Sequence, residues 1–205
     1  MLFCLFLINC CGYKNEGNTQ FFCEKQNLNC DVKENLLVFY TSKGIIKVKL
    51  FPKSHPITVA NFISNVKNKI YSNTNFYKII NYPSNKLIHN GLNKVNDYGQ
   101  TSLRDISKIN TIPLEIKLTN KEPIYETMII NPKQLKNIKH KFEKGSLSMV
   151  KVSNKRSSST EFFFSLNNLP EFDGRYSIFG KVVSGSKILN NIDKKDFIKK
   201  IEFEN

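Results

Sequence analysis

The chain alternates short apolar runs with polar punctuation, and the first two runs predict a β-hairpin. LLVFYT and IIKVKLF begin at Leu36 and Ile45, and Ser42-Lys43-Gly44 joins them. Glycine adopts positive φ at no steric cost, so Gly44 suits a tight turn between two strands. We therefore expect a β-sheet to begin here.

The stretch from Pro56 to Tyr71 has the period of a helix instead. Its apolar residues recur at spacings of three and four, which puts them on one helical face. These residues are Val59, Phe62, Ile63, Val66 and Ile70. Proline is tolerated in the first turn of a helix, so Pro56 fits its start. The pattern predicts an amphipathic helix that buries one stripe.

Further β-prone runs follow in the second half of the chain. Phe162-Phe163-Phe164 and Tyr176–Val183 are short and apolar, and Asn, Pro, Gly and Asp residues separate them, as is typical of barrel strands. The chain has 205 residues, of which 40% are hydrophobic, so it can bury one sizeable core. One domain accounts for the pattern.

Several unusual short patterns occur in a fixed order between Lys144 and Gly185. They are Gly145-Ser146-Leu147-Ser148-Met149, Glu161-Phe162-Phe163, Phe172-Asp173-Gly174 and Ile178-Phe179-Gly180-Lys181-Val182. In this order they resemble the second half of a cyclophilin. The first half is similar to the same family through GIIKVKL from Gly44, PITVANF from Pro56, FYKII from Phe76 and LIHNG from Leu87.

The resemblance covers roughly residues 36–203 and implies both a fold and an activity. The implied fold is mainly β, a closed antiparallel eight-stranded β-barrel capped by two helices. The implied activity is binding of proline-containing peptides and cis/trans isomerisation of their X-Pro bonds. Resonance holds the amide planar with a barrier of about 18–20 kcal/mol, so the catalyst must stabilise a twisted prolyl nitrogen. That task requires no cofactor, metal or nucleophile.

Lys78 stands where the family has its catalytic arginine, so the resemblance implies that Lys78 is the catalytic residue. A lysine keeps the positive charge and can donate a hydrogen bond, but it lacks the parallel donors of a guanidinium. A loss of about 1–3 kcal/mol of transition-state stabilisation would slow the reaction about five- to more than a hundredfold. We therefore expect reduced activity. Without the surrounding motif, Lys78 would be one more surface lysine.

The other candidate residues form an apolar substrate pocket with an altered polar rim. The resemblance places Phe163, Met149, Leu87 and Phe172 at apolar substrate-binding positions. At polar substrate-binding positions it places His89 and Glu161, where glutamines are usual, and Tyr176, where a histidine is usual. The alternative for Phe163 and Met149 is an ordinary place in the core.

The N-terminus carries a possible targeting signal. Met1–Ile8 is continuously apolar but far shorter than the roughly 20 residues of a transmembrane helix, and it is typical of a signal-peptide core. Leu7-Ile8-Asn9-Cys10 resembles a bacterial lipobox, in which Cys10 would be acylated. Asn9 is larger than the usual residue there, and no Lys or Arg precedes the run, so an ordinary cleaved signal or an apolar tail is the alternative. We expect an exported, membrane-anchored lipoprotein on the periplasmic or cell-surface face.

The chain therefore divides into a signal segment over residues 1–10, a polar tether over 11–35 and a cyclophilin-like domain over 36–205. The tether is rich in Asn, Lys and Glu, which favours a flexible linker. An exported location permits a disulfide between Cys23 and Cys30. We expect no metal site, because no cysteine–histidine pair has zinc-like spacing.

The formal net charge of +14 raises the question of an anionic partner. Only Arg104, Arg156 and Arg175 are arginines, and lysine lacks the planar fork favoured for base and phosphate recognition. Nucleic acid is therefore disfavoured, whereas acidic proteins or an anionic lipid surface fit a basic surface. The insertion over residues 116–144 includes the lysine-rich stretch 131–144, which forms either a basic helix or turn or a solvated loop.

Three functional hypotheses follow from these observations. The first, which we favour, is an exported peptidyl-prolyl isomerase that assists the folding of other exported proteins. The second is a proline-peptide-binding or chaperone-like module on the same barrel, catalytically weak or inactive because its polar rim has changed. The third is a basic interaction protein that uses the barrel as a scaffold and whose partner binding depends strongly on salt.

Overall fold

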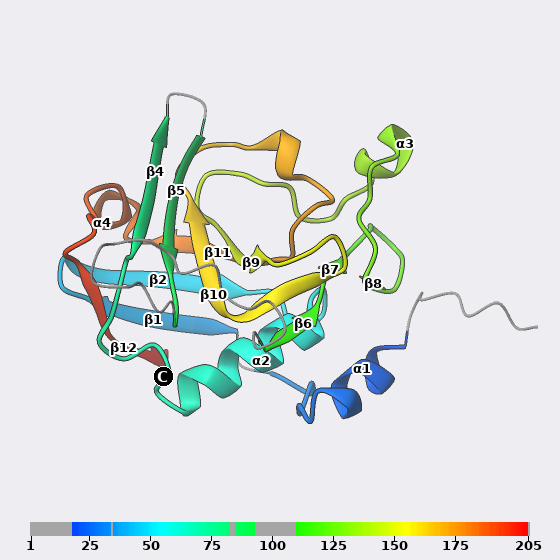
Figure 1. Cartoon of the computed structure of the whole chain (residues 1–205), viewed down its shortest axis with the longest axis horizontal. Coiled ribbons are helices and arrows are strands. Elements are labelled where there is room, and N and C mark those ends of the chain that lie inside the picture. Colours follow the sequence, from blue (N-terminus) through cyan, green and yellow to red (C-terminus); the bar gives the residue numbers. More distant parts are fainter. Residues whose placement is uncertain (1–17, 34, 83–84, 93–109, 205) are drawn as a thin grey trace, which may run out of the picture.

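The computed structural model describes residues 18–33, 35–82, 85–92 and 110–204, and one curled antiparallel sheet dominates it (Figure 1). The hydrogen-bonded order is β3 (Thr74–Asn75), β12 (Phe197–Phe203), β1 (Leu36–Thr41), β2 (Gly44–Leu50), β11 (Ile178–Ser184), β9 (Ser146–Lys151), β10 (Arg156–Ser165), β5 (Asn85–Asn90) and β4 (Lys78–Tyr82), with β6 (Thr111–Pro113) paired to β10. The expected mainly β fold is confirmed.

The expected closed barrel of eight strands is wrong in closure and in strand number. The sheet has ten strands, and β3 and β4, at the two ends of its order, are not paired with each other in the described part of the chain. Only Phe76-Tyr77 separates these two strands. The Phe76 N–H donates to Asp196 O (3.0 Å) and its side chain is buried, so the segment changes partner there, from β12 to β5. The sheet therefore curls into a half-barrel whose ladder stays open.

The predicted hairpin is confirmed. β1 pairs with β2 from Leu36↔Lys49 to Thr41↔Gly44. The turn is closed by Thr41, whose Oγ1 accepts hydrogen bonds from the N–H groups of Lys43 (3.2 Å) and Gly44 (3.1 Å). Gly44 has φ +137°, a conformation that favours glycine.

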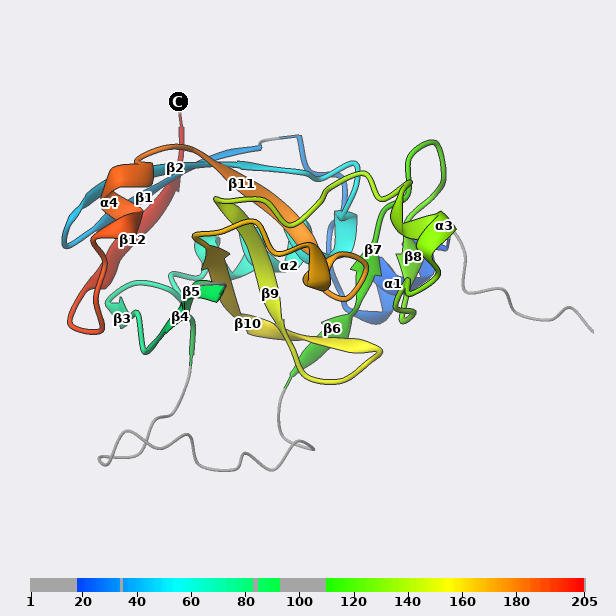
Figure 2. The same cartoon turned by 90° about the horizontal axis from the view of Figure 1, so that it is seen from above.

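The predicted amphipathic helix is α2 (Pro56–Lys67), the longest helix described, and it lies against the curled sheet (Figures 1 and 2). Val59, Phe62, Ile63 and Val66 are buried as expected. The helix ends before Ile70, because Lys69 adopts φ +55°. The other helices are short: α1 (Thr19–Lys25), α3 (Pro132–Leu135), α4 (Ser186–Asn190) and the 3₁₀ turn η2 (Pro170–Phe172). Two capping helices were expected, and one long helix, α2, is present in the described residues.

A buried carboxylate caps the start of α2. Glu115, on β7 (Glu115–Ile116), is fully buried and accepts hydrogen bonds from the Ile57 N–H (3.2 Å), the Thr58 N–H (3.0 Å) and the Thr58 hydroxyl (2.7 Å). Free N–H groups and the helix dipole at this end both favour an acceptor. Burial nevertheless outweighs these bonds and raises the pKa of Glu115 to about 7.

Residues 18–33 fold against the barrel, which contradicts the expected polar tether for this part of residues 11–35. Phe22, on α1, is 5% exposed and its ring lies 4.6 Å from that of Tyr125, while Thr19 Oγ1 lies 2.6 Å from the Tyr125 hydroxyl. A disulfide joins Cys23 to Cys30, as the sequence permitted. The segment is mostly polar, so its composition gave no indication of the short apolar face around Phe22. Residues 1–17, including Cys10, lie outside the described residues.

The insertion over residues 116–144 forms a small structured lobe and not a plain solvated loop, and its residues 132–135 form the short helix α3, in agreement with the alternative of a basic helix or turn. β7 pairs with β8 (Ile124–Tyr125), and six buried side chains make a separate apolar cluster: Leu114, Ile116, Leu118, Ile124, Ile129 and Ile138. The lobe docks on the loop after η2, where the Ile129 N–H donates to Gly174 O (2.8 Å). A Cβ atom at Gly174 would lie 2.3 Å from Ile129 O, so only glycine allows this contact.

Within residues 18–33, 35–82, 85–92 and 110–204, no helix has the length and apolar character needed to cross a membrane.

Candidate active site

A row of directly opposed residues crosses five neighbouring strands and builds one face of the candidate site. Lys78 on β4 faces His89 on β5, His89 faces Phe163 on β10, Phe163 faces Ser148 on β9, and Ser148 faces Ile178 on β11. Directly opposed residues in an antiparallel sheet share a face. Three of the expected site residues, Lys78, His89 and Phe163, therefore lie side by side.

Aromatic rings extend this row into what we call the aromatic cluster, made of His89, Phe142, Phe163, Phe172 and Tyr176. The ring of His89 lies 5.1 Å from that of Phe163, and the Phe163 ring lies 5.6 Å from that of Tyr176. Tyr176 in turn stacks on Phe172 at 4.7 Å. Leu87, Leu169 and Ile178 are buried against the same rings. The structure thus brings together the expected positions Leu87, His89, Phe163, Phe172 and Tyr176.

Phe142 is the member of the cluster that sequence reasoning missed. Its ring lies 5.7 Å from that of Phe163 with the two planes 10° apart, and both side chains are nearly fully buried, at 2% and 1% exposure. The backbone is fixed on both sides: the Phe142 N–H donates to Asp173 Oδ1 (2.7 Å), and Phe142 O accepts from the Leu169 N–H (2.8 Å). The only sequence signal was a lone aromatic within the lysine-rich run KHKFEKG.

Met149 lies apart from the cluster, contrary to the expectation that it lines the same pocket. It pairs with Phe162, one position from the Phe163–Ser148 pair, and neighbouring residues on a strand point to opposite faces. Both Met149 and Phe162 belong to the main core, beneath α2. Val150, next along β9, packs against the aromatic cluster instead.

His89 is held neutral. It is 8% exposed, and burial together with the nearby charge of Lys78 lowers its pKa to about 4. Its Nε2 is buried and has no hydrogen-bond partner among the described residues. A peptide carbonyl or N–H could use this nitrogen only after the cluster opens.

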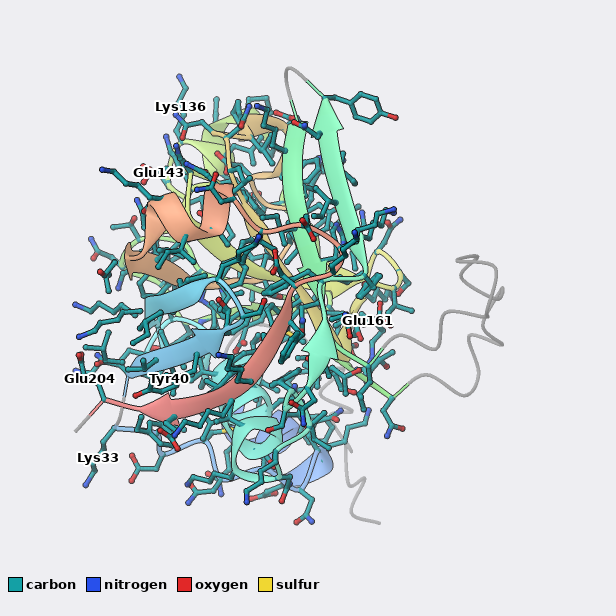
Figure 3. The ribbon with its side chains drawn as sticks, turned by 90° about the vertical axis from the view of Figure 1, so that its left-hand side faces the viewer. Lys33, Tyr40, Lys136, Glu143, Glu161 and Glu204 are labelled. Carbon is teal, nitrogen blue, oxygen red and sulfur yellow. A yellow bond between two sulfur atoms is a disulfide. The ribbon has the colours of Figure 1, made fainter. Side chains whose placement is uncertain are left out.

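Glu161 sits beyond His89 at the edge of the cluster. Its carboxylate accepts a hydrogen bond from the Tyr77 hydroxyl (3.3 Å), and the Tyr77 ring lies 6.1 Å from that of His89. In Figure 3, Glu161 is labelled at the right of the molecule, and Lys136 and Glu143 at its upper left. Glu161 therefore lies at the polar edge of the cluster, next to Tyr77 and His89.

Lys151 is a second basic residue of the rim that sequence reasoning missed. It ends β9 and is half-buried, and its Nζ lies 5.3 Å from the centroid of the Tyr176 ring. An ammonium over an aromatic face is attracted by the negative potential of the ring. Lys78, by contrast, is exposed. The rim thus carries two lysines on different strands.

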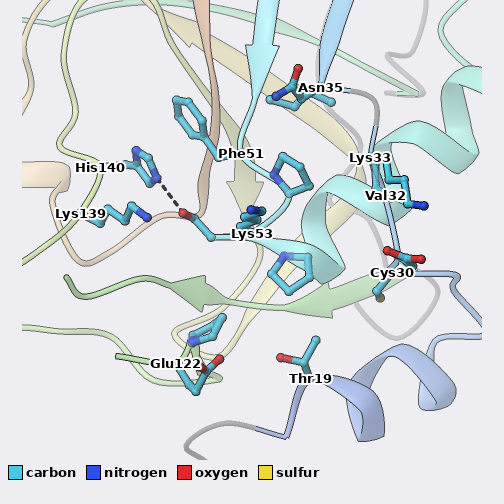
Figure 4. Close-up of a pocket in the computed structure, with 16 residues that line it drawn as sticks. Thr19, Cys30, Val32, Lys33, Asn35, Phe51, Lys53, Glu122, Lys139 and His140 are labelled. Atoms are coloured by element: carbon cyan, nitrogen blue, oxygen red, sulfur yellow. Dashed lines mark hydrogen bonds between the residues drawn. The ribbon is translucent and has the colours of Figure 1, made fainter. Parts of the chain in front are cut away.

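A separate groove of about 730 Å³ lies between residues 30–33, Asn35 and the turn that precedes α2 (Figure 4). Leu50, Phe51, Pro52 and Pro56 line it, together with Lys33, Lys53 and Lys139. His140 stacks on Phe51 at 4.0 Å, and its Nε2 lies 3.0 Å from Ser54 Oγ. Burial and nearby Lys139 lower the pKa of His140 to about 4, so the His140 ring is uncharged at neutral pH.

No group of three or more His, Cys, Asp or Glu side chains in the described part of the chain is arranged to hold a metal ion. The candidate site contains the ammonium groups of Lys78 and Lys151, the neutral His89 ring and an aromatic surface. Such a site can hold an apolar ring and donate a hydrogen bond to a developing charge beside it.

Comparisons with known proteins agree with this geometry. The family model described as "Cyclophilin type peptidyl-prolyl cis-trans isomerase/CLD" matches residues 36–202. A peptidyl-prolyl cis-trans isomerase of Helicobacter pylori is 28% identical over 165 residues, which is 80% of this chain and 83% of the relative. One of Acinetobacter baylyi is 27% identical over 157 residues, 74% of this chain and 68% of the relative.

Solved structures show the same fold at low sequence identity. A cyclophilin-type isomerase of Cryptosporidium parvum superposes with a TM-score of 0.57 at 23% identity, covering 84% of this chain and 99% of the other. The cyclophilin AquaCyp293 of Hirschia baltica gives 0.56 at 18% identity, covering 92% and 81%. With the family model matched over residues 36–202, this chain belongs to the cyclophilin-type peptidyl-prolyl cis-trans isomerase family.

Proposed function

We propose that the protein is a peptidyl-prolyl cis-trans isomerase of exported polypeptides, with Lys78 as its catalytic cation. The observation that carries the proposal is the row Lys78–His89–Phe163, which sets an exposed ammonium beside an aromatic surface on adjacent strands. Family membership supports the activity. A related Cryptosporidium parvum isomerase, 24% identical, was solved in the presence of the dipeptide Ala-Pro, which supports proline-containing peptides as the substrate class.

The chemistry follows from the X-Pro amide. In the twisted transition state the prolyl nitrogen loses its resonance with the carbonyl and gains basicity. Lys78 donates a hydrogen bond to this nitrogen or to the carbonyl oxygen, while the aromatic cluster holds the proline ring. Glu161 contacts the peptide backbone, and so does His89 once the cluster opens and exposes its Nε2. The single ammonium stabilises the transition state less than a guanidinium does, because it lacks two parallel donors.

Isomerisation of a short X-Pro peptide tests the proposal, measured by NMR exchange on the full chain. We expect acceleration that falls in both Lys78→Ala and Phe163→Ala. Phe163→Ala removes a buried ring at a cost of about 3–5 kcal/mol of stability, so its fold is verified by thermal unfolding first. Acceleration that is unchanged in Lys78→Ala would remove the assigned role of the lysine.

A second candidate function has its own observation. Phe163 is 1% exposed beneath His89 and Phe142, so in this conformation the cluster presents little of the Phe163 ring to a proline. This favours a proline-peptide-binding or chaperone-like module with weak or no catalysis. Binding of proline peptides without acceleration at high protein concentration would select it over the isomerase.

The proposal includes export and attachment to a membrane. It is supported by the apolar run Met1–Ile8, by the lipobox-like Cys10 and by the Cys23–Cys30 disulfide, which suits an oxidising compartment. Mass spectrometry of the mature N-terminus tests it. A diacylglyceryl Cys10 is expected, whereas an unmodified chain with another N-terminus would remove the lipoprotein assignment.

A further inference from the structure

Two lysines border the aromatic cluster, and neither has a carboxylate partner among the described residues. Lys78 lies opposite His89, and Lys151 lies over Tyr176. Elsewhere in the same residues, Lys43, Lys47, Lys181 and Lys200 each have a carboxylate within 4.0 Å. The cluster therefore carries positive charge that no carboxylate of the described residues pairs with.

Lys151 is the better placed of the two to act on substrate choice, because its side chain is half-buried and oriented. Its Nζ lies 5.3 Å from the Tyr176 ring centroid and 4.0 Å from Met128 Sδ. A thioether is a weak acceptor, whereas an ammonium has three donors. The ammonium is thus held against the cluster with donor capacity to spare.

Among the described residues, no carboxylate lies within 4.0 Å of the Nζ atom of Lys78 or Lys151. Glu161 is engaged with the Tyr77 hydroxyl, and Asp173 Oδ1 accepts the Phe142 N–H. Glu171, beside Phe172, is exposed to solvent. A bound peptide can supply the carboxylate partner that Lys151 lacks in the described part of the chain.

We propose that Lys151 determines specificity by favouring X-Pro peptides with Asp or Glu next to the proline. This inference rests on the proposed isomerase function and names its substrate class. A proline held on Phe163, Phe172 and Tyr176 places its neighbouring residue along the face that Lys151 borders. A carboxylate there gains a charge-assisted hydrogen bond, and a lysine there is repelled.

The experiment compares kcat/KM for amidated peptides that differ only in the residue next to the proline, which is Glu, Gln or Lys. One peptide series varies the residue before the proline and the other the residue after it. The full chain is assayed by NMR exchange as wild type, Lys151→Gln, Lys151→Arg and Lys155→Gln. Lys155 is an exposed lysine on the turn between β9 and β10, so it controls for loss of a charge on the same hairpin.

We expect wild type to prefer Glu over Gln about two- to fivefold in at least one series, the range set by partly exposed ion pairs. The preference should disappear in Lys151→Gln, persist in Lys151→Arg and Lys155→Gln, and weaken as salt is raised. A merely structural role of Lys151 would change all peptides equally. Equal rates for Glu and Gln peptides in wild type, or a preference that survives in Lys151→Gln, would overturn the proposal.

The outcome also separates this inference from the proposed function. If no peptide is isomerised, the isomerase assignment fails, and NMR titration of the same peptides then compares their affinities. A preference for Glu in the dissociation constants that depends on Lys151 supports the inference for a binding module. Equal dissociation constants overturn it there as well.

Discussion

The ring of Phe142 lies parallel to that of Phe163, with centroids 5.7 Å apart and planes 10° from each other. Phe163 comes from β10, and Phe142 comes from the last residues of the insertion over 116–144. Hydrogen bonds with Asp173 and Leu169 fix the backbone of Phe142, so the Phe142 side chain is the part that can rotate away from Phe163. The residue expected to hold proline is thus covered by a residue of the same chain.

Replacing Phe142 should raise the affinity for proline peptides. If the cover is open one time in ten, apparent affinity is about tenfold below that of the open site, and Phe142→Ala recovers this factor. The change also leaves a cavity that costs about 3–5 kcal/mol, so Phe142→Leu is measured beside it. The measurement is NMR titration with an Ala-Pro peptide and its Ala-Ala counterpart.

The thermal shift of the same variants provides the control. A proline ring that fills the space left by Phe142 should stabilise Phe142→Ala more than it stabilises wild type, and the Ala-Ala peptide should not. Unchanged affinity in both variants would show that Phe142 is an ordinary wall of the cluster.

The sequence predicted the fold and most of the cluster because these depend on local patterns. Alternation and a helical stripe located β1, β2 and α2, and short motifs located His89, Phe163, Phe172 and Tyr176 on adjacent strands. Met149 was misplaced because one position along a strand reverses the face, and the motif alone does not give that face. Its neighbour Val150 packs on the cluster instead.

The missing parts depend on contacts between distant segments. Phe142 reaches the cluster through an inserted lobe whose own core, around Ile116 and Ile129, no motif describes. Phe22 packs on Tyr125, about a hundred residues away, inside a stretch whose average composition is polar. Composition averages over such single side chains, so it predicted a tether where a short helix docks.

Lys78→Arg should increase kcat/KM about five- to more than a hundredfold, if the guanidinium restores about 1–3 kcal/mol of transition-state stabilisation. Lys86→Arg, on β5 opposite Asn81, is the matched control and should change the rate little. NMR exchange on a single X-Pro peptide measures both. Equal rates for wild type and Lys78→Arg would indicate that residue 78 does not contact the reacting amide.

Removing the Cys23–Cys30 disulfide should loosen the N-terminal extension and leave the barrel intact. The loop between the two cysteines is short, so the chain-entropy model gives about 2 kcal/mol. In a Cys23→Ser/Cys30→Ser variant we expect faster hydrogen exchange of the Leu28 amide, which donates to Cys23 O at 2.9 Å. Exchange in β1 should stay unchanged. Similar acceleration in both regions would mean that the extension and the barrel unfold as one unit.

The buried carboxyl of Glu115 should make stability fall as pH rises. Its pKa of about 7 exceeds the unfolded value of 4.5, so between these pH values the folded protein keeps a proton that the unfolded chain has lost. His55, His89 and His140 have lowered pKa values, so over an overlapping pH range they make stability rise with pH.

The test therefore isolates Glu115 by comparing wild type with Glu115→Gln. The free energy of unfolding by urea is measured for both from pH 4.5 to 8, and the difference between them is followed. Relative to the variant, wild type should lose on the order of 3 kcal/mol across that range. Exposed Glu122→Gln should run parallel to wild type, and a parallel curve for Glu115→Gln would contradict the assigned pKa.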